Sequence, residues 1–262
     1  MCIVFWKLLD DGLVLAFNRD EYFARPTLGF HYWPSHPTIL APQDLHPPPS
    51  QRGTYLGTAP HSKRLAFLTN FREPPSPAKQ SRGPLVRDYL LTSKPALDYA
   101  QSVYEQRHQY NGFNLVLFDL DKRQVVYVTN RGYGGEGIVK VLVESGVVGL
   151  SNSTIDDKTW PKVEQGKEAF ARVLESSKGE QSLISNLVQV MSDPGPFATS
   201  LPQCLDDLQQ CIYVPELSNI GGLPSAGLYG TRTTDIIILT ASQLTIAERD
   251  HDGSIKTSKI NL

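Results

Sequence analysis

The chain opens with two short apolar segments that restrict its fold strongly. Residues Ile3 to Leu9 and Leu13 to Asn18 are rich in β-branched, aromatic and aliphatic side chains, and the intervening Asp10-Asp11-Gly12 is a hairpin signal. Both alternating faces of each strand are apolar, so we expect the hairpin to be buried on its two sides. Such a hairpin requires one layer of structure above it and another below it.

The rest of the chain predicts clusters of strands separated by pairs of helices. The expected strands are Thr54 to Thr58, Leu65 to Thr69, Phe113 to Phe118, Val125 to Thr129, Ile138 to Val143, Val147 to Leu150, Thr234 to Leu239 and Leu244 to Glu248. The expected helices are one with Ser81 as N-cap and Pro84 in its first turn, then Ala96 to Arg107, Lys162 to Glu175 and Gln181 to Met191. This order predicts an α+β fold with antiparallel sheets between helical layers, in a single domain spanning 1–262.

Charge and composition exclude several classes of function. The formal net charge of −2 lacks the basic surplus that tracks a phosphate backbone, so nucleic acid is not an expected partner. The three cysteines, Cys2, Cys204 and Cys211, form no CxxC pair, which argues against a disulfide framework and a structural zinc site. The six histidines form no HExxH motif, and no metal site is expected. The glycines between Gly132 and Gly137 predict a hairpin loop rather than a phosphate-binding loop.

The first nine residues do not resemble a targeting segment. They are mostly apolar, but no basic flank precedes them and Asp10 and Asp11 follow at once. No apolar run approaches the roughly 20 residues that span a bilayer. We therefore expect a soluble, cytoplasmic protein without a transmembrane segment, and association with mitochondria or the Golgi stays open.

The cysteine at position 2 is the pivotal candidate for chemistry. An initiating methionine is commonly removed when the next residue is small, which would leave Cys2 with a free α-amine. A thiol with a pKa near 8.5 and an amine with a pKa near 8 would then lie on one residue, and the amine can act as the general base for the sulfur. The alternative is a small buried residue at the start of a strand.

The pairing of the hairpin predicts what lies next to the thiol. A three-residue loop places Cys2 opposite Asp20, and a two-residue loop places it opposite Glu21. We favour the first register because it pairs Phe5 with Phe17. Opposed side chains have Cβ atoms roughly 4.5 to 5.5 Å apart, so a carboxylate can hold an ammonium and an arginine can favour a thiolate. The candidate residues at this end of the second strand are Asn18, Arg19, Asp20 and Glu21, of which Asn18 and Glu21 are expected to bind a ligand.

A series of short motifs follows along nearly the whole chain. They are Met1-Cys2-Ile3-Val4-Phe5, Asn18-Arg19-Asp20-Glu21, Arg25-Pro26, Gly53-Thr54-Tyr55-Leu56-Gly57, Leu68-Thr69-Asn70, Ser81-Arg82-Gly83, Tyr110-Asn111-Gly112-Phe113-Asn114, Gly149-Leu150-Ser151-Asn152 and Tyr229-Gly230-Thr231-Arg232-Thr233. Their order resembles the NRDE family, also called the transport and Golgi organization protein 2 family. Tyr55 departs from the pattern, because the family usually has tryptophan there.

The resemblance implies a fold and a set of site residues. The family is similar to the N-terminal nucleophile hydrolases, whose four-layer αββα sandwich agrees with the layers expected above, and most like the bile-salt and penicillin V acylases. This similarity implies that Arg19 and Asp20 lie beside Cys2, with Asn70, Asn152 and Arg232 completing the catalytic set. An amide such as that of Asn70 can donate to the oxygen of a tetrahedral intermediate. Turn-capping asparagines and a structural arginine are the alternatives.

Two hypotheses of function follow. In the first, an N-terminal-cysteine amidohydrolase cleaves the C–N amide bond of a small acylated molecule, with Cys2 as nucleophile and Asp20 orienting its amine. In the second, the same pocket binds haem or an acyl lipid without turnover, as the family's links to secretion, Golgi organization, mitochondria, haem and acyl lipids suggest. No cofactor is required by the first hypothesis. For haem, Cys2, His31 or His61 are candidate iron ligands.

Overall fold

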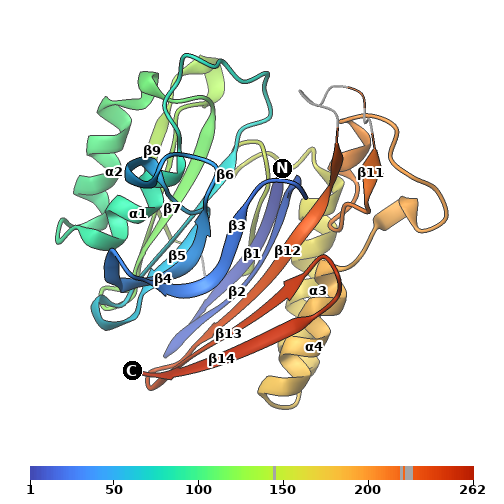
Figure 1. The fold of residues 1–262 in the computed structure, drawn as a ribbon. Coiled ribbons are helices and arrows are strands. Elements are labelled where there is room, and N and C mark those ends of the chain that lie inside the picture. Colours follow the sequence, from blue (N-terminus) through green and yellow to red (C-terminus); the bar gives the residue numbers. More distant parts are fainter. Residues whose placement is uncertain (144–145, 219–220, 222–226) are drawn as a thin grey trace. The chain divides into compact units, whose positions relative to one another are not determined.

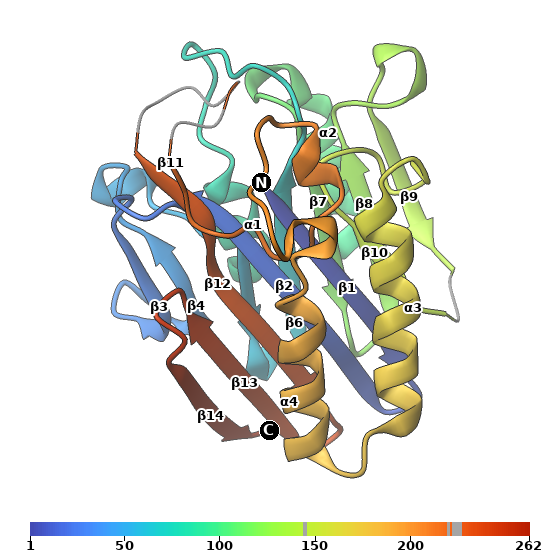
Figure 2. The ribbon, with the colours of Figure 1, turned by 90° about the vertical axis from the view of Figure 1, so that its right-hand side faces the viewer.

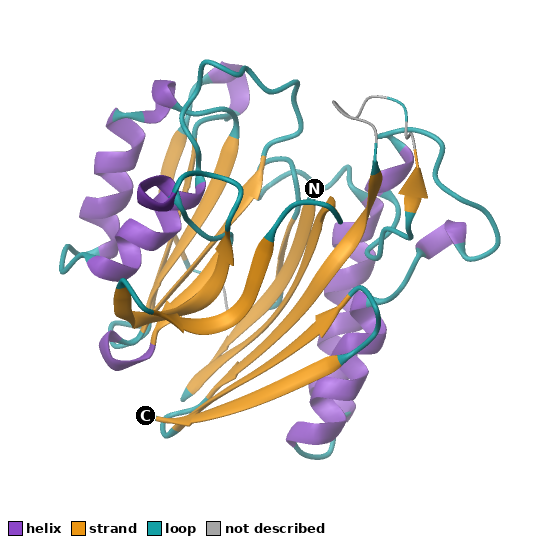
Figure 3. Ribbon diagram, viewed as in Figure 1, coloured by secondary structure: helices purple, strands orange, loops and turns teal. Residues whose placement is uncertain are grey.

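The computed structural model describes residues 1–143, 146–218, 221 and 227–262, and these residues form two compact units. The first unit comprises residues 1–24, 144–151 and 155–261, and the second comprises residues 25–143, 152–154 and 262. Each described unit contains a seven-stranded antiparallel sheet and a pair of α-helices (Figure 3). The predicted α+β class with antiparallel sheets and paired helices is confirmed.

The sheet of the first unit contains the hairpin at the start of the chain. Its strand order is β10-β1-β2-β12-β13-β14, and β11 pairs with β12. The helices α3 and α4 lie side by side on one face of this sheet (Figure 2). The bounds are β1 (Cys2–Leu9), β2 (Gly12–Tyr22), β10 (Val148–Leu150), α3 (Pro161–Ser176), α4 (Glu180–Met191), β11 (Leu217–Ser218), β12 (Leu228–Leu239), β13 (Gln243–Asp250) and β14 (Ile255–Asn261).

Both expected registers of the hairpin are wrong by at least one residue. The structure pairs Leu9 with Gly12, which places Cys2 opposite Arg19. Gly12 is a strand residue and not part of the turn, and a Cβ atom on it would lie 1.9 Å from the carbonyl oxygen of Leu239 in β12. A shift of one residue reverses the face on which each side chain lies. The third strand therefore determines which groups share a face with the thiol.

The helix-facing side of the first sheet carries one apolar core. Phe5 of β1 packs beneath α3, where a Cβ atom on Gly166 would lie 2.1 Å from its ring. Only glycine allows the helix to approach the sheet this closely. The core consists of Ile3, Phe5, Val14, Ala16, Trp160, Val163, Phe170, Ile184, Leu187, Met191, Ile212, Ile236, Ile238 and Ala247. Burial on this face agrees with the expectation from the apolar pattern.

The second unit is built from consecutive strands in the order β3-β4-β5-β6-β7-β8-β9. The helices α1 and α2 pack on this sheet (Figure 1). The core between the helices and the sheet includes Tyr89 and Tyr99. Arg64 of β6 fixes the end of α1 by donating to the carbonyl oxygens of Tyr89, Thr92 and Lys94 at 2.6–3.2 Å. The bounds are β3 (Thr27–Trp33), β4 (His36–Asp44), β5 (Leu56–Ala59), β6 (Arg64–Asn70), α1 (Gly83–Leu91), α2 (Ala96–Glu105), β7 (Phe113–Asp119), β8 (Gln124–Thr129) and β9 (Ile138–Leu142).

Short 3₁₀ helices lie in the connections between these elements. They are Pro49–Gln51, Pro60–Ser62, Arg107–Gln109, Tyr133–Gly135, Gly195–Phe197 and Asp207–Gln209. The predicted hairpin loop between Gly132 and Gly137 is confirmed, because it joins the paired strands β8 and β9. Among the residues described, no α-helix combines the length and the apolar character that crossing a bilayer requires.

Several elements differ from the sequence prediction for identifiable reasons. Strands β3, β4 and β14 have no counterpart among the predicted strands, because β3 and β14 are edge strands with exposed polar positions and β4 contains Pro37 and Pro42. The N-cap of α1 is Arg82 and not Ser81. The chain enters α1 through the close approach of Gly83 to the backbone of Gly53, which no local pattern reveals. Helix α2 ends at Glu105, before the predicted Arg107.

Candidate functional site

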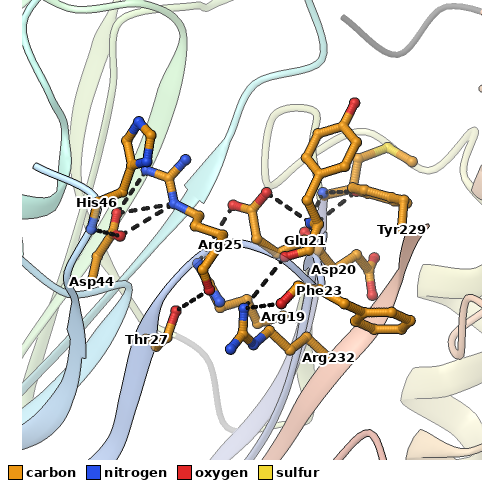
Figure 4. Close-up of polar contacts among 12 residues, drawn as sticks. Arg19, Asp20, Glu21, Phe23, Arg25, Thr27, Asp44, His46, Tyr229 and Arg232 are labelled. Atoms are coloured by element: carbon orange, nitrogen blue, oxygen red, sulfur yellow. Dashed lines mark hydrogen bonds and ion pairs between the residues drawn. The ribbon is translucent and has the colours of Figure 1, made fainter. Parts of the chain in front are cut away.

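The open end of the β1–β2 hairpin brings Cys2 and Arg19 together. They are directly opposed in the antiparallel pair and therefore lie on the same face of the sheet. Glu21 lies two residues further along that face, and its carboxylate contacts the Arg19 guanidinium at 3.4 Å (Figure 4). Glu21 also accepts a hydrogen bond from the Tyr22 backbone N–H at 2.9 Å. The face that carries the thiol thus also carries one cation and one anion.

The Cys2 thiol is buried and protonated in this arrangement. Only 6% of the residue is exposed. Burial raises the pKa of the thiol to about 11, while the Met1 ammonium and Arg19 lower it and Asp20 and Glu21 raise it further. The Cys2 carbonyl oxygen accepts a hydrogen bond from the Ser151 hydroxyl at 2.7 Å, which ties β1 to the end of β10. A nucleophile in this state needs a nearby base to remove its proton.

The Asp20 carboxylate lies on the opposite, helix-facing side of the sheet. Its Oδ1 accepts a hydrogen bond from the Thr231 hydroxyl at 2.7 Å, and its Oδ2 has no hydrogen-bond partner among the described residues. Burial raises the pKa of the Asp20 carboxyl, and the Met1 and Lys162 ammonium groups and the Thr231 hydrogen bond lower it. Asp20 is therefore next to Cys2 along the strand pair, but its carboxylate does not share the face of the Cys2 side chain.

The backbone of Asp20 holds the first residue of the chain. The Asp20 N–H donates to the Met1 carbonyl oxygen at 2.8 Å, and the Met1 ammonium donates to the Asp20 carbonyl oxygen at 2.9 Å. The ammonium also donates to the phenol oxygen of Tyr229 (Figure 4). Tyr229 is buried, and its hydroxyl donates to the Asp20 carbonyl oxygen at 3.3 Å. The hairpin end thus binds an α-ammonium group through a carbonyl and a phenol rather than through a carboxylate.

Asn18 joins β2 to the structure behind it. Its Nδ2 donates to the carbonyl oxygens of Met191 at 2.7 Å and Ile212 at 3.0 Å. Its Oδ1 accepts a hydrogen bond from the Thr234 hydroxyl at 2.7 Å. The side chain is fully buried. In the described chain Asn18 therefore positions the strand that carries Arg19 and Asp20, and its role as a ligand-binding residue stays a prediction.

Arg232 occupies a β-bulge between β12 and β2. The pairing shifts between Thr231, which faces Asp20, and Thr233, which faces Arg19, so Arg232 is the extra residue. A bulge redirects the side chain of the residue it inserts. The Arg232 guanidinium donates to the carbonyl oxygens of Tyr22 at 3.3 Å and Phe23 at 3.1 Å (Figure 4). The predicted late cation thus binds the backbone at the end of β2.

The second unit contains the two predicted asparagines. Asn152 Nδ2 donates to the Asn70 carbonyl oxygen at 2.7 Å, and the Asn152 carbonyl oxygen accepts from the Arg72 N–H at 2.8 Å. Asn70 ends β6, and Asn152 follows β10 in the chain. The motif residue Arg25 binds the Asp44 carboxylate through two nitrogens at 2.7–3.2 Å (Figure 4). The asparagines therefore lie together, and their catalytic role stays a prediction.

Three residues near Asp20 were missed by the sequence prediction. Tyr229 and Thr231 lie in a motif of which only Arg232 was singled out, and their position beside Asp20 follows from the pairing of β12 with β2. Lys162 is 1% exposed although it lies in the first turn of α3. Nothing in the sequence distinguishes it from a solvated lysine, because its burial depends on packing between α3 and the sheet.

The fold and the hairpin end define an α+β protein whose buried second residue is a cysteine opposed by an arginine. The sequence model of the family described as Transport and Golgi organisation 2 matches residues 1–253. The chain therefore belongs to the Transport and Golgi organisation 2 family, as the motifs predict.

Relatives in animals match along most of their length. The chain is 32% identical over 273 residues to the Transport and Golgi organization protein 2 homolog of Bos taurus, covering 98% of this chain and 95% of the relative. It is 32% identical over 265 residues to the homolog of Homo sapiens, covering 95% of this chain and 92% of the relative. Over 204 residues it is 26% identical to Transport and Golgi organization protein 2 of Drosophila melanogaster, covering 73% and 71%. These names link the family to transport and Golgi organization.

Proposed function

We propose that this protein is an N-terminal-cysteine amidohydrolase that cleaves the C–N amide bond of a small acylated molecule. The observation that carries the proposal is the hairpin end, where Cys2 lies opposite Arg19 and an α-ammonium group is held by Asp20 and Tyr229. An amine and a thiol at one strand end are the two groups that this chemistry requires. The family motifs around Cys2 support the same assignment.

The proposed mechanism depends on removal of Met1. With Met1 in place, the α-amine lies one residue before the thiol, and burial keeps the pKa of Cys2 at about 11. After removal, the amine belongs to Cys2 and can accept the thiol proton directly. Arg19 then lies across the strand pair from the developing thiolate and stabilises its charge. In the structure the Asp20 carbonyl oxygen, rather than its carboxylate, accepts a hydrogen bond from the Met1 amine, which lies one residue before the amine that the mechanism requires.

The test compares chains that differ at Cys2. Protein shown by intact mass to lack Met1 is mixed with a library of small acyl amides, and the first turnover is followed as a burst of released amine. We expect a burst that Cys2→Ala abolishes and that Cys204→Ala leaves unchanged, because Cys204 is exposed and lies in another segment. Absence of a burst from the protein lacking Met1, together with labelling of Cys2 by iodoacetamide no faster than Cys204, would refute the proposal.

A second candidate function is binding without turnover. The buried, protonated thiol favours it, as do relatives whose names refer to transport and not to catalysis. Haem and acyl lipids are the ligands proposed for this case. As an iron ligand Cys2 fits poorly because its sulfur is buried and protonated, which leaves the rings of His31 and the exposed His61. A shift of the Soret band in a haem titration would support haem binding, if His61→Ala or His31→Ala removes that shift. An unshifted band would exclude haem binding.

The two candidates respond differently to loss of the sulfur. A hydrolase loses its function in Cys2→Ala, whereas a carrier retains ligand binding. The place of action is part of the same proposal: we infer a cytoplasmic protein that associates with the Golgi or with mitochondria. Fractionation of cells tests this, and recovery of the protein in neither organelle fraction would contradict the association.

A further inference from the structure

Met1 extends the pairing of β1 with β2 through its backbone atoms alone. The reciprocal hydrogen bonds between its backbone and that of Asp20 continue the antiparallel ladder by one residue beyond Cys2. A separate small molecule with a carbonyl group and an amine at the same spacing can form the same two bonds. This position is adjacent to Cys2, which carries the proposed nucleophile.

The ammonium end of this position is built from two acceptors. They are the Asp20 carbonyl oxygen and the phenol oxygen of Tyr229. Tyr229 is 3% exposed, and burial raises its pKa well above that of an ordinary tyrosine, so the phenol keeps its proton and donates to Asp20. Because the phenol proton is directed at Asp20, the phenol oxygen presents a lone pair to an amine. The two acceptors therefore recognise a protonated α-amine.

The side-chain end of this position is apolar. Met1 packs against a cluster formed by Leu208, Cys211, Val214, Leu217 and Tyr229, together with the partly buried Tyr22, Phe197 and Leu205. These residues come from the segment after α4 and from β2, β11 and β12. Burying a methionine-sized side chain is worth about 1.5–3 kcal/mol. We call the groups that contact Met1, namely the Asp20 backbone, the Tyr229 phenol and this cluster, the aminoacyl subsite.

We infer that the aminoacyl subsite, after removal of Met1, binds the acyl portion of the substrate, and that this portion is an α-aminoacyl group with a free amine and an unbranched or leucine-sized apolar side chain. This inference rests on the proposed function, since it names the substrate class of that reaction. Removal of Met1 would otherwise leave the Asp20 N–H without its present partner and the Asp20 carbonyl oxygen with Tyr229 alone, which is unfavourable for a buried backbone group. A ligand carbonyl and ammonium restore both hydrogen bonds.

The reaction in this subsite balances with water as the only co-reactant. The Cys2 sulfur bonds to the acyl carbon, which lies next to Cys2 because the carbonyl carbon of Met1 is bonded to the Cys2 nitrogen in the structure. The C–N bond of the amide breaks, and the thiol proton passes through the Cys2 α-amine to the departing amine. Water then attacks the thioester, which releases the free amino acid and restores the thiol.

The test measures binding and does not require turnover. L-methioninamide is titrated by calorimetry into two preparations whose intact masses show absence or retention of Met1, the second made in cells with methionine aminopeptidase inhibited. We expect binding to the chain that lacks Met1 and none to the chain that retains it. Glycinamide, which lacks the side chain, and N-acetyl-L-methioninamide, which lacks the ammonium, should each bind about tenfold or more weakly. Equal titration of both preparations, or none of the chain lacking Met1, would overturn the inference.

A conservative variant separates the subsite from a general effect on folding. Tyr229→Phe keeps the ring in the apolar cluster and removes only the acceptor for the amine. In the chain lacking Met1 it should weaken L-methioninamide about tenfold and leave N-acetyl-L-methioninamide unchanged. If another amide gives an acyl burst while L-methioninamide does not bind, the inference fails and the proposed function stands. If L-methioninamide binds but no amide is cleaved, the proposed function fails, and the assignment of the bound group as a substrate fails with it, although the subsite still binds an α-aminoacyl ligand.

Discussion

Replacing Asn18 by alanine should strongly destabilise the first unit. The side-chain amide makes three buried hydrogen bonds, two to the carbonyl oxygens of Met191 and Ile212 and one from the Thr234 hydroxyl. These partners come from the end of α4, the segment after it and β12. Asn18→Ala leaves all three without this partner and opens a small space beside them.

The expected cost follows from the number and burial of these bonds. A typical hydrogen bond contributes about 1 kcal/mol to stability, and a buried acceptor left unsatisfied costs about 1–3 kcal/mol. Because two carbonyl oxygens lose a donor, and neither is near solvent at the fully buried Asn18 side chain, we expect a loss of about 3–5 kcal/mol in the free energy of unfolding. The same change removes the tether that positions Arg19 and Asp20.

Urea unfolding of the full chain measures this loss. With a denaturant dependence of about 3 kcal/mol/M, the midpoint should fall by roughly 1–1.7 M. The matched control is Asn261→Ala on the exposed edge strand β14, which should change the free energy of unfolding by less than about 0.5 kcal/mol. An Asn18→Ala midpoint within error of the control would refute the assignment of Asn18 as a buried tether.

Three other substitutions or measurements test separate parts of the structure. Gly166→Ala forces a methyl group into the Phe5 ring and should lower the free energy of unfolding by about 1–3 kcal/mol in the same urea assay. The control is Gly146→Ala, where a Cβ atom meets no atom within 4 Å, and it should be nearly neutral. In the chain that retains Met1, alkylation of Cys2 should be slower than alkylation of the exposed Cys204. Because only the thiolate reacts, the rate at Cys2 should rise about tenfold per pH unit up to about pH 11. A rate that levels off near pH 8 would contradict the raised pKa of Cys2. Arg64→Met removes three hydrogen bonds at the end of α1 and should lower the free energy of unfolding by about 2–4 kcal/mol. Arg64→Lys should recover part of this loss. Equal losses in both variants would show that the guanidinium geometry is irrelevant.

The elements with strong local patterns were predictable. The helices α3 and α4 lie within one residue of their predicted bounds, because apolar side chains recur at helical spacing along both. The strands β7 and β8 are buried along nearly their whole length, and their apolar runs identify them in the same way. Strands β3 and β14 lie at sheet edges, where half or more of the side chains are accessible to solvent and the apolar pattern is lost.

The sequence predicted which residues lie at the candidate site better than it predicted how they are arranged. The motifs identify Cys2, Arg19, Asp20 and Arg232, and the structure places all four at the end of the β1–β2 hairpin or at the β12 bulge beside it. The sequence also favours a pairing of Cys2 with Asp20, which is wrong. It gives no indication that Tyr229 holds the first residue of the chain.

The amino-acid sequence alone determines that the chain begins with a hairpin buried on two sides, that a cysteine and a polar motif meet at its open end, and that the chain resembles one family. Those features depend on local patterns and on the order of residues. Tertiary structure decides the register, because Gly12 must fit against the backbone of Leu239, more than 200 residues away. It decides which groups share a face with the thiol, because strand side chains alternate and a shift of one residue exchanges Asp20 for Arg19.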